Sequence, residues 1–579
     1  MDYSEVDKVR RSSTPPQLDV VESFMGGRLS RREFITRGSI IGLSMASMTA
    51  IIAACSSAAS PSPSAAGSAA ASAGASAAGS ASASAGASAP AASGKTGGTI
   101  RIGCQRPKGL DPVSMVDLAS YGITAQSFEF LCTLAPNAID IAPGLALSWK
   151  PDSTLKVWTF NLRQNVTWQD GSPFTSADVV ATMERLVKAG NSGLKGVITA
   201  GSAVATDANT VTFTLQGPNG NFPYLVSVFN AQTLITPAAY AAGTTLDKQH
   251  AGTGAWKLDS YDIASGAKFS RNDKWWGGKT PLDSTEFTFF DDTGAMVTAY
   301  QGQQIDALVQ FDVLTGAPLF TDANFTVFDT PTTNHREIWM RCDTGQFADK
   351  RVRQAFALTI DRPALISSLF KGKAELANDH VIWQHYPYFS DGVAQRAQDI
   401  AKAKQLLSDA GKSDLKVTLQ YGKLQEIPDL AVLLQSMAAP AGITITPAGG
   451  DNNPFYDLQW CPPKPADPPC SGAAEFGIVD YGHRATPDVF LNSAFKSKGV
   501  WNSSQYSSAD FDAAFTEFQG ANGVDAQKAA CAKIEKIMNE DVPVALPYWY
   551  NYLSGNSKKF TGVYTCALGQ MFVSAASAV

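Results

Sequence analysis

Residues able to do acid–base, nucleophilic or metal chemistry are few and scattered in this sequence. Its five histidines are His250, His335, His380, His385 and His483. None belongs to a His-Glu-x-x-His pair, and the sequence contains no Gly-x-Ser-x-Gly, Gly-x-Gly-x-x-Gly or phosphate-loop motif. Asp291 and Asp292 could be read as a hydrolase dyad, but adjacent residues on a strand point to opposite faces, so a solvated turn is expected. The sequence therefore predicts no enzyme, no cofactor and no metal site.

The first 54 residues have the pattern of an export signal. The letters SRREFI at residues 30–35 form a twin-arginine pattern, and an uncharged, moderately apolar stretch follows at 38–54. Small residues precede Cys55, as a lipoprotein signal peptidase requires. We expect a twin-arginine lipoprotein signal peptide over residues 1–54 and lipid on Cys55. An uncleaved membrane anchor or an ordinary amphipathic helix is the alternative, although the stretch is short for a bilayer span.

The composition changes abruptly after this segment. Residues 56–94 are only Ala, Ser, Gly and Pro, which cannot bury enough apolar surface to fold, so residues 55–97 are expected to be a linker. The 579-residue chain is 44% hydrophobic with a net charge of −6, which excludes a wholly disordered chain. Its acidic balance, without a Lys/Arg block, argues against nucleic-acid binding.

Export changes how the eight cysteines are interpreted. With Cys55 set aside for lipid, seven remain, so at least one is free or pairs in trans. Cys461 and Cys470 flank a proline-rich segment. A disulfide between them would constrain a loop whose prolines prevent the regular hydrogen bonding of a strand or helix. A metal site is the alternative to this disulfide, but the sequence lacks pairs of Cys or His with the spacing that metal ligands usually have. The partners of the other cysteines cannot be read from the sequence.

Strand and helix patterns alternate along the remaining chain. Residues 156–163 and 210–215 alternate apolar and polar side chains, which predicts two half-buried strands. Residues 175–178 between them carry a capping pair that begins a helix. Asp361 and Asp399 are expected to cap two further helices. This mixture predicts α/β lobes.

Several longer blocks resemble a known family. In sequence order they read PGLALSW at 143–149, VWTFNLR at 157–163, WQDGSPFTSADVV at 168–180, GTGAWKL at 252–258, RNDKWW at 271–276, FADKRVRQA at 347–355 and TIDR at 359–362. Together they resemble the signature of family 5 extracytoplasmic solute-binding proteins, the peptide/nickel-type receptors of ABC importers. The resemblance covers about residue 98 to the end of the chain.

The resemblance implies a periplasmic-binding-protein-like Venus flytrap of class α/β, with two lobes that close on a ligand and an extra subdomain on the larger lobe. By block position, we expect the first lobe at residues 98–131, 247–331 and 545–579. The extra subdomain is expected at 132–246 and the second lobe at 332–544. Because ligand contacts form fully only in the closed state, ligand would shift the population toward closure.

The resemblance also points to the ligand pocket. In this family a segment ending in Phe-Leu runs along the cleft, and here it reads VDYGHRATPDVFL at 479–491. Tyr481 stands where the family usually has Trp. Arg484 stands where oligopeptide-binding members carry an Asp that pairs with the peptide amine. A guanidinium suits a carboxylate or phosphate and repels an ammonium, so an anionic or polyhydroxyl group is expected at Arg484. Internal pairing of Arg484 with Asp480 or Asp488 is the alternative.

Further candidate ligand contacts lie in segments that border the expected cleft. They are Tyr121, Asn334, His335, Arg336, Trp383, Trp460, Asp480 and His483. Aromatic walls with few polar anchors are typical of binding clefts, but each aromatic residue could instead belong to the core or the surface.

The implied function is that of a substrate-binding lipoprotein of an ABC importer. It would capture a peptide-like or other small, anionic solute and deliver it to the permease. The expected partners are the permease and ATPase subunits, and a monomer is expected at the outer face of the cytoplasmic membrane, periplasmic or at the cell surface. A ligand sensor on the same fold, feeding a signalling partner, is the first alternative, and a surface enzyme or adhesin is the second. The sequence leaves the ligand open.

Overall fold

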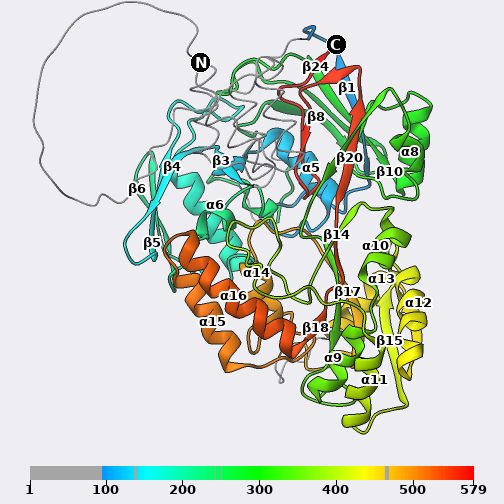
Figure 1. Cartoon of the computed structure of the whole chain (residues 1–579). Coiled ribbons are helices and arrows are strands. Elements are labelled where there is room, and N and C mark those ends of the chain that lie inside the picture. Colours follow the sequence, from blue (N-terminus) through cyan, green and yellow to red (C-terminus); the bar gives the residue numbers. More distant parts are fainter. Residues whose placement is uncertain (1–93, 136–139, 241–242, 249–250, 463–468) are drawn as a thin grey trace, which may run out of the picture. The chain divides into compact units, whose positions relative to one another are not determined.

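The computed structural model describes residues 94–135, 140–240, 243–248, 251–462 and 469–579 (Figure 1). The predicted signal peptide, Cys55 and almost all of the predicted linker lie outside the described residues. Among the described residues, no helix combines the length and the apolar character that a membrane crossing requires.

The first sheet combines strands from three distant parts of the chain. Its order is β12, β20, β11, β1, β10, β9 and β8. The bounds are Phe325–Thr330 (β12), Tyr552–Ser557 (β20), Ala307–Leu308 (β11), Thr99–Gln105 (β1), Ser284–Phe290 (β10), Gly266–Arg271 (β9) and Trp256–Asp262 (β8). Strand β1 runs parallel to β10 and β11, and the other pairs are antiparallel.

Two helices beside the first sheet begin at aspartates. Asp117 caps α5 (Leu118–Ser127) and Asp292 caps α8 (Thr293–Gln301), each by accepting a backbone N–H. The neighbouring Asp291 is exposed and pairs with Arg106 at 3.0 Å. The pair Asp291–Asp292 therefore forms a solvated turn at a helix start, as expected.

A smaller antiparallel sheet carries the predicted half-buried strands. Its order is β4 (Ala146–Pro151), β5 (Val157–Leu162), β7 (Thr210–Thr214) and β6 (Ala203–Asp207). Trp158, Phe160 and Phe213 point into the core, as their alternation predicted. Helix α6 (Ser176–Ala189) begins at the predicted capping box of Thr175 and Asp178. Shorter elements nearby are β2 (Cys132–Leu134), β3 (Ile141–Pro143), α7 (Phe222–Leu225) and η1 (Ala231–Thr233).

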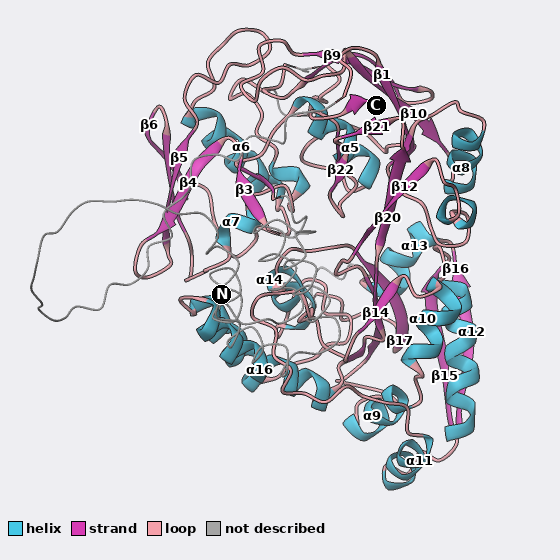
Figure 2. Ribbon diagram, turned by 45° about the horizontal axis from the view of Figure 1, so that its top comes forward, coloured by secondary structure: helices cyan, strands magenta, loops and turns pink. Residues whose placement is uncertain are grey.

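The second large sheet has the order β14, β19, β13, β17, β15 and β16, with β18 also paired to β13. The bounds are Ala374–Leu376 (β14), Tyr548–Tyr550 (β19), His335–Met340 (β13), Phe476–Tyr481 (β17), Leu415–Gly422 (β15), Ile443–Gly450 (β16) and Val544–Ala545 (β18). The helices packed around it are α9 (Lys350–Leu358), α10 (Arg362–Phe370), α11 (Ile400–Asp409), α12 (Ile427–Ala438), α13 (Asn452–Phe455), α14 (Asp488–Phe490), α15 (Ala509–Gly520) and α16 (Val524–Asp541) (Figures 1 and 2). Asp361 and Asp399 cap α10 and α11, as predicted.

Both faces of this second sheet are covered, and alternate residues of its strands enter different cores. Ile338 and Met340 of β13 pack into a cluster with residues of α9 to α12. Trp339, between them, packs into another cluster with Tyr481 and residues of α15 and α16. The helices α12 and α16 accordingly lie on opposite sides of β17 in Figure 1. A strand in this position is buried on both faces and carries few exposed side chains.

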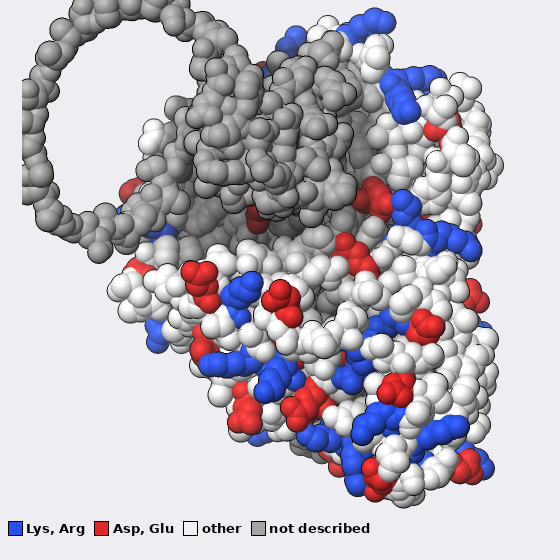
Figure 3. Space-filling model, in the orientation of Figure 1, with Lys and Arg blue, Asp and Glu red and all other residues white. Residues whose placement is uncertain are grey.

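The two large sheets with their helices form a two-lobe α/β fold, as expected. The chain passes between the sheets from β12 to β13 and again from β19 to β20. The lobe boundaries given above stay a prediction. On the face in Figure 3, basic and acidic side chains of the described residues are interspersed.

A disulfide joins Cys461 and Cys470, with 4.2 Å between their Cα atoms, as the proline-rich loop led us to expect. Among the described residues, the free cysteines are Cys104, Cys132, Cys342, Cys531 and Cys566. Burial raises the pKa of the Cys342 and Cys566 thiols to about 12. These thiols are therefore protonated and unreactive at neutral pH.

Candidate functional site

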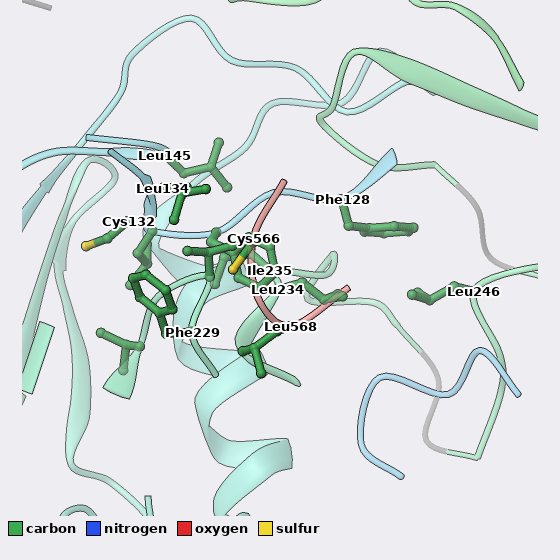
Figure 4. Close-up of a cluster of buried hydrophobic side chains, with 14 of the residues drawn as sticks. Phe128, Cys132, Leu134, Leu145, Phe229, Leu234, Ile235, Leu246, Cys566 and Leu568 are labelled. Atoms are coloured by element: carbon green, nitrogen blue, oxygen red, sulfur yellow. The ribbon is translucent and has the colours of Figure 1, made fainter. Parts of the chain in front are cut away.

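A cavity of about 250 Å³ lies between two walls built from distant parts of the chain. Residues from 116–121, 192–193, 224–232 and 568 form one wall, and residues from 484–489 together with Trp501 form the other. Figure 4 shows Phe229 and Leu568 of the first wall within a cluster of buried hydrophobic side chains. Ala485 and Val489 of the other wall belong to the same cluster, so the two walls pack together there.

Arg484 is the cationic side chain of the cavity lining, and its backbone is fixed on both sides. Its N–H donates to Thr333 Oγ1 at 2.7 Å, and its carbonyl accepts from the Tyr386 hydroxyl at 2.7 Å. Its Nη1 donates to the carbonyl of His483 at 2.8 Å. Nη1 also donates to the Gly482 carbonyl at 3.4 Å, so Nε and Nη2 are the donors that remain for a bound group.

No carboxylate pairs with Arg484 in the described part of the chain. Asp480 instead forms an ion pair with Arg336. Asp488 accepts from Asn221 Nδ2 at 2.9 Å and from Asn219 Nδ2 at 3.4 Å. Both acids that could have neutralised Arg484 are therefore engaged elsewhere.

Tyr121 lies on the other wall of the cavity and interacts electrostatically with Arg484. Burial raises the pKa of the Tyr121 hydroxyl, and the Arg484 guanidinium acts in the opposite direction. Burial lowers the pKa of Arg484. Among the groups that raise this pKa in return, Tyr121 has the largest effect. A half-buried guanidinium opposite a neutral phenol leaves the cavity electropositive, which suits an anionic or polyhydroxyl group.

Arg336 is fully buried and saturated by protein groups rather than facing the cavity. Its Nε and Nη2 donate to the two carboxylate oxygens of Glu426 at 2.7 and 2.9 Å. Its Nη2 also donates to Gln425 Oε1 at 2.7 Å, and its Nη1 to the Tyr550 hydroxyl at 2.9 Å and to Asp480. Arg336 and Asp480 therefore stabilise the protein interior next to β19, where the chain leaves the second sheet.

Both histidines of the predicted site are buried and neutral. Burial lowers the pKa of His335 and His483 to about 3. His483 Nδ1 lies 3.1 Å from the Thr333 N–H, and its ring packs edge-on against Phe229, 5.6 Å between centroids. His335 Nδ1 lies 2.8 Å from the Thr333 carbonyl. His483 therefore contacts Phe229, a residue of the cavity lining, without lining the cavity itself.

The other predicted residues lie near the cavity without lining it. The Tyr481 ring is 5.9 Å from that of Trp501, which lines the cavity, and the Trp460 ring lies 6.2 Å from Tyr481. Trp383 donates to Glu375 Oε2 at 3.1 Å. The Asn334 carbonyl accepts from the Tyr550 N–H at 2.9 Å. Of the predicted contacts, Tyr121 and Arg484 are thus the ones that line the cavity.

Sequence reasoning missed several lining residues. Phe229, Asn230, Gln232, Thr486 and Trp501 all line the cavity. They come from loops or short turns, where neither the helical nor the strand period marks an inward position. Thr486 alone had a signal, because it lies two residues after Arg484 in the cleft segment.

A profile of the family described as bacterial extracellular solute-binding proteins, family 5 Middle, matches residues 140–521. The chain belongs to solute-binding protein family 5. Family 5 members are extracytoplasmic receptors, not enzymes, that bind small solutes such as peptides and work with an ABC permease and ATPase.

Individual relatives of this family 5 protein are distant. The periplasmic murein peptide-binding protein MppA of Escherichia coli is 26% identical over 77% of this chain and 86% of its own length. Heme-binding protein A of Haemophilus influenzae is 22% identical over 76% of this chain and 84% of its own length. The structure of the ABC transporter substrate-binding protein CtaP from Listeria monocytogenes matches with a TM-score of 0.73 and 20% identity, covering 84% of this chain and all of CtaP. These names cover different solutes, so the relatives share the fold and leave the ligand of this chain open.

Proposed function

We propose that this protein is the substrate-binding lipoprotein of an ABC importer, and that it captures a small solute with an anionic or polyhydroxyl group. The observation that carries the proposal is Arg484, a cation without a carboxylate partner among the described residues, in a cavity between two walls. A half-buried charge without a carboxylate partner is costly, which favours a role in binding an outside group.

Capture would occur by hinge closure. The two walls come from parts of the chain that the predicted lobe boundaries assign to different lobes, so a solute in the cavity would contact both. A solute that binds the closed form better shifts the population toward it, and the permease would then receive that form.

The test combines native mass spectrometry with thermal unfolding. The solute retained on native purification identifies the bound compound, and adding it back should raise the melting temperature. In Arg484→Ala, we expect retention to fall at least about tenfold, since a charge-assisted hydrogen bond contributes about 1.5–3 kcal/mol. Arg351→Ala is the matched control, because Arg351 pairs with Asp349 outside the cavity. Unchanged retention in Arg484→Ala would contradict the role of Arg484.

Lipid attachment at Cys55 is a separate part of the proposal, supported by the signal pattern of residues 30–55. Radiolabelled palmitate should label the wild-type chain and not Cys55→Ser, and the variant should leave the membrane fraction. Replacement of Arg31 and Arg32 by lysines should retain the precursor inside the cell. Labelling of Cys55→Ser would refute attachment at this residue.

A further inference from the structure

Three amide side chains are hydrogen-bonded to one another at the first wall of the cavity. Asn230 and Gln232 line the cavity, and the buried Asn191 lies next to both. Asn191 Nδ2 donates to Gln232 Oε1. Gln232 Nε2 in turn donates to the carbonyls of Val113 and Met115 at 2.8 and 3.0 Å. Gln232 is therefore held by protein groups at both ends of its amide.

The orientation of the Asn230 amide is fixed by the protein. Its Nδ2 donates to Asn191 Oδ1 at 3.2 Å and to the Leu225 carbonyl at 3.0 Å. Asn191 Oδ1 is itself fixed, because it accepts from the Gly193 N–H at 3.0 Å. Since both partners of Nδ2 are acceptors, the nitrogen and the oxygen of the Asn230 amide cannot be exchanged. Among the described residues, none donates a hydrogen bond to Asn230 Oδ1.

Gly193 leaves the space that this orientation requires. A Cβ atom at position 193 would lie 2.9 Å from Asn230 Nδ2, closer than Cβ atoms approach other atoms in proteins. Asn230 is half-buried in the cavity wall. Its fixed amide therefore presents a neutral acceptor, and not a donor, to a bound solute.

The other polar side chains of this lining add no negative charge. Among the described residues, no Asp or Glu lines the cavity. The Tyr224 hydroxyl donates to Asp140 Oδ1 at 3.1 Å, and the Thr486 side chain is hydrogen-bonded to Asp488. The Tyr121 hydroxyl can donate or accept. The cavity thus has guanidinium donors on one wall and a neutral amide acceptor on the other.

The cavity is small and has apolar surface beside these polar groups. Its volume of about 250 Å³ lies below the range of most ligand pockets, about 300–1,000 Å³. Phe229, Val489, Trp501 and Leu568 contribute aromatic or aliphatic surface to the lining. A compact solute with a short apolar body and few polar groups matches this lining in size and polarity.

We propose that the solute is a small hydroxycarboxylic acid that binds with its carboxylate on Arg484 and its hydroxyl on Asn230. The carboxylate accepts from Arg484 Nε and Nη2, and the hydroxyl donates to Asn230 Oδ1. An ammonium in place of the hydroxyl would lose its hydration beside a guanidinium and without a carboxylate, so an amino acid binds less tightly. This inference rests on the proposed function, because it names the solute class of the same cavity.

The test compares two acids on the full-length protein by isothermal titration. Phenyllactate carries the hydroxyl, and hydrocinnamate differs only by lacking it. We expect phenyllactate to bind the wild type about threefold to tenfold more tightly than hydrocinnamate, and the two to bind equally in Asn230→Ala. Arg484→Ala should weaken both acids and keep their ratio. Asn324→Ala is the matched control, since Asn324 is exposed and lies outside the cavity lining, and it should change neither affinity.

The methyl ether of phenyllactate tests the same hydrogen bond without a variant, in case Asn230→Ala fails to fold. Its ether oxygen accepts but cannot donate, so it should bind the wild type no more tightly than hydrocinnamate. Equal binding of the two acids to the wild type, full retention of the preference in Asn230→Ala, or tighter binding of the ether overturns the hydroxyl contact. Hydrocinnamate binding that Arg484→Ala weakens would then leave the proposed function in place. Binding of neither acid overturns the solute class, and the solute retained on native purification then tests the proposed function alone.

Discussion

Arg336 and Asp480 lie directly opposite each other on the antiparallel strands β13 and β17 and form an ion pair in which the guanidinium is fully buried. Glu426 completes this network through two hydrogen bonds to the same guanidinium. Removing one partner leaves a buried charge without compensation, which is far more destabilising than losing a surface pair.

The first prediction follows from this network. Glu426→Ala should lower the free energy of unfolding by about 3 kcal/mol, because it leaves Arg336 with one carboxylate. Urea unfolding followed by circular dichroism measures the change. Asp414→Ala, which removes an exposed pair with Lys416, should change stability by less than about 0.5 kcal/mol. A loss below 1 kcal/mol for Glu426→Ala would show that water replaces the missing carboxylate.

Arg484 should behave in the opposite way. Arg484→Met removes a half-buried charge that lacks a carboxylate partner among the described residues, so the unfolding free energy of the ligand-free protein should stay within about 0.5 kcal/mol or rise. Retention of the natural solute should fall at the same time. Thermal and urea unfolding of ligand-free protein decide the first point. A destabilisation of 2 kcal/mol or more would instead indicate that Arg484 holds the cleft segment in place.

Buried carboxyls predict a loss of stability above neutral pH. Burial raises the pKa of Glu129 to about 7 and that of Glu337 and Glu535 to about 8, from 4.5. The folded state then binds more protons than the unfolded state between pH 4.5 and 8, so this stability is present below pH 4.5 and lost as the pH rises through 8. From pH 6.5 to 8 we expect the unfolding free energy to fall by about 2–4 kcal/mol.

Buried histidines limit the pH range in which the effect of the carboxyls on the unfolding free energy can be measured alone. Burial lowers the pKa of His335 and His483 to about 3 and that of His380 to about 4. Because the unfolded chain then binds more protons at these histidines, the unfolding free energy of the protein falls as the pH drops below 6.5. Urea unfolding at pH 6.5, 7.25 and 8 therefore isolates the carboxyls. Glu337→Gln should flatten the decline, and an equally steep decline in this variant would rule out Glu337 as a contributor.

The sequence predicted those parts of the fold whose local pattern matches their environment. Trp158 and Phe160 alternate on a sheet with one buried face, and Asp399 caps its helix through its own side chain. Arg484 was singled out because residues 479–491 resemble the family's cleft segment, and it lines the cavity. The burial of Glu337 could not be predicted, because nothing in the sequence shows that β13 is covered on both faces. Trp501 lies in a loop, where only tertiary packing decides its direction.

Asn221 forms hydrogen bonds with residues of the segments that carry Asp488 and Gln527. Removing these bonds should favour an open form of the protein and leave the residues that line the cavity unchanged. Asp488, on the segment that carries Arg484, accepts from Asn221 Nδ2 at 2.9 Å, and Asn221 Oδ1 accepts from Gln527 at 3.0 Å. Asn221→Ala removes both bonds and none of the lining residues. It should shift the population toward an open form, which lowers the apparent affinity for the natural solute by about threefold to tenfold.

Small-angle scattering measures this shift directly. The radius of gyration of ligand-free Asn221→Ala should exceed that of the wild type and return to the wild-type value at saturating solute, because the solute contacts are intact. Thr206→Ala, on the exposed face of the small sheet, is the control and should change neither quantity. An Asn221→Ala protein with the wild-type radius and a weakened affinity would instead mean that Asn221 acts on the cavity itself, through Asp488 and the segment that holds Arg484.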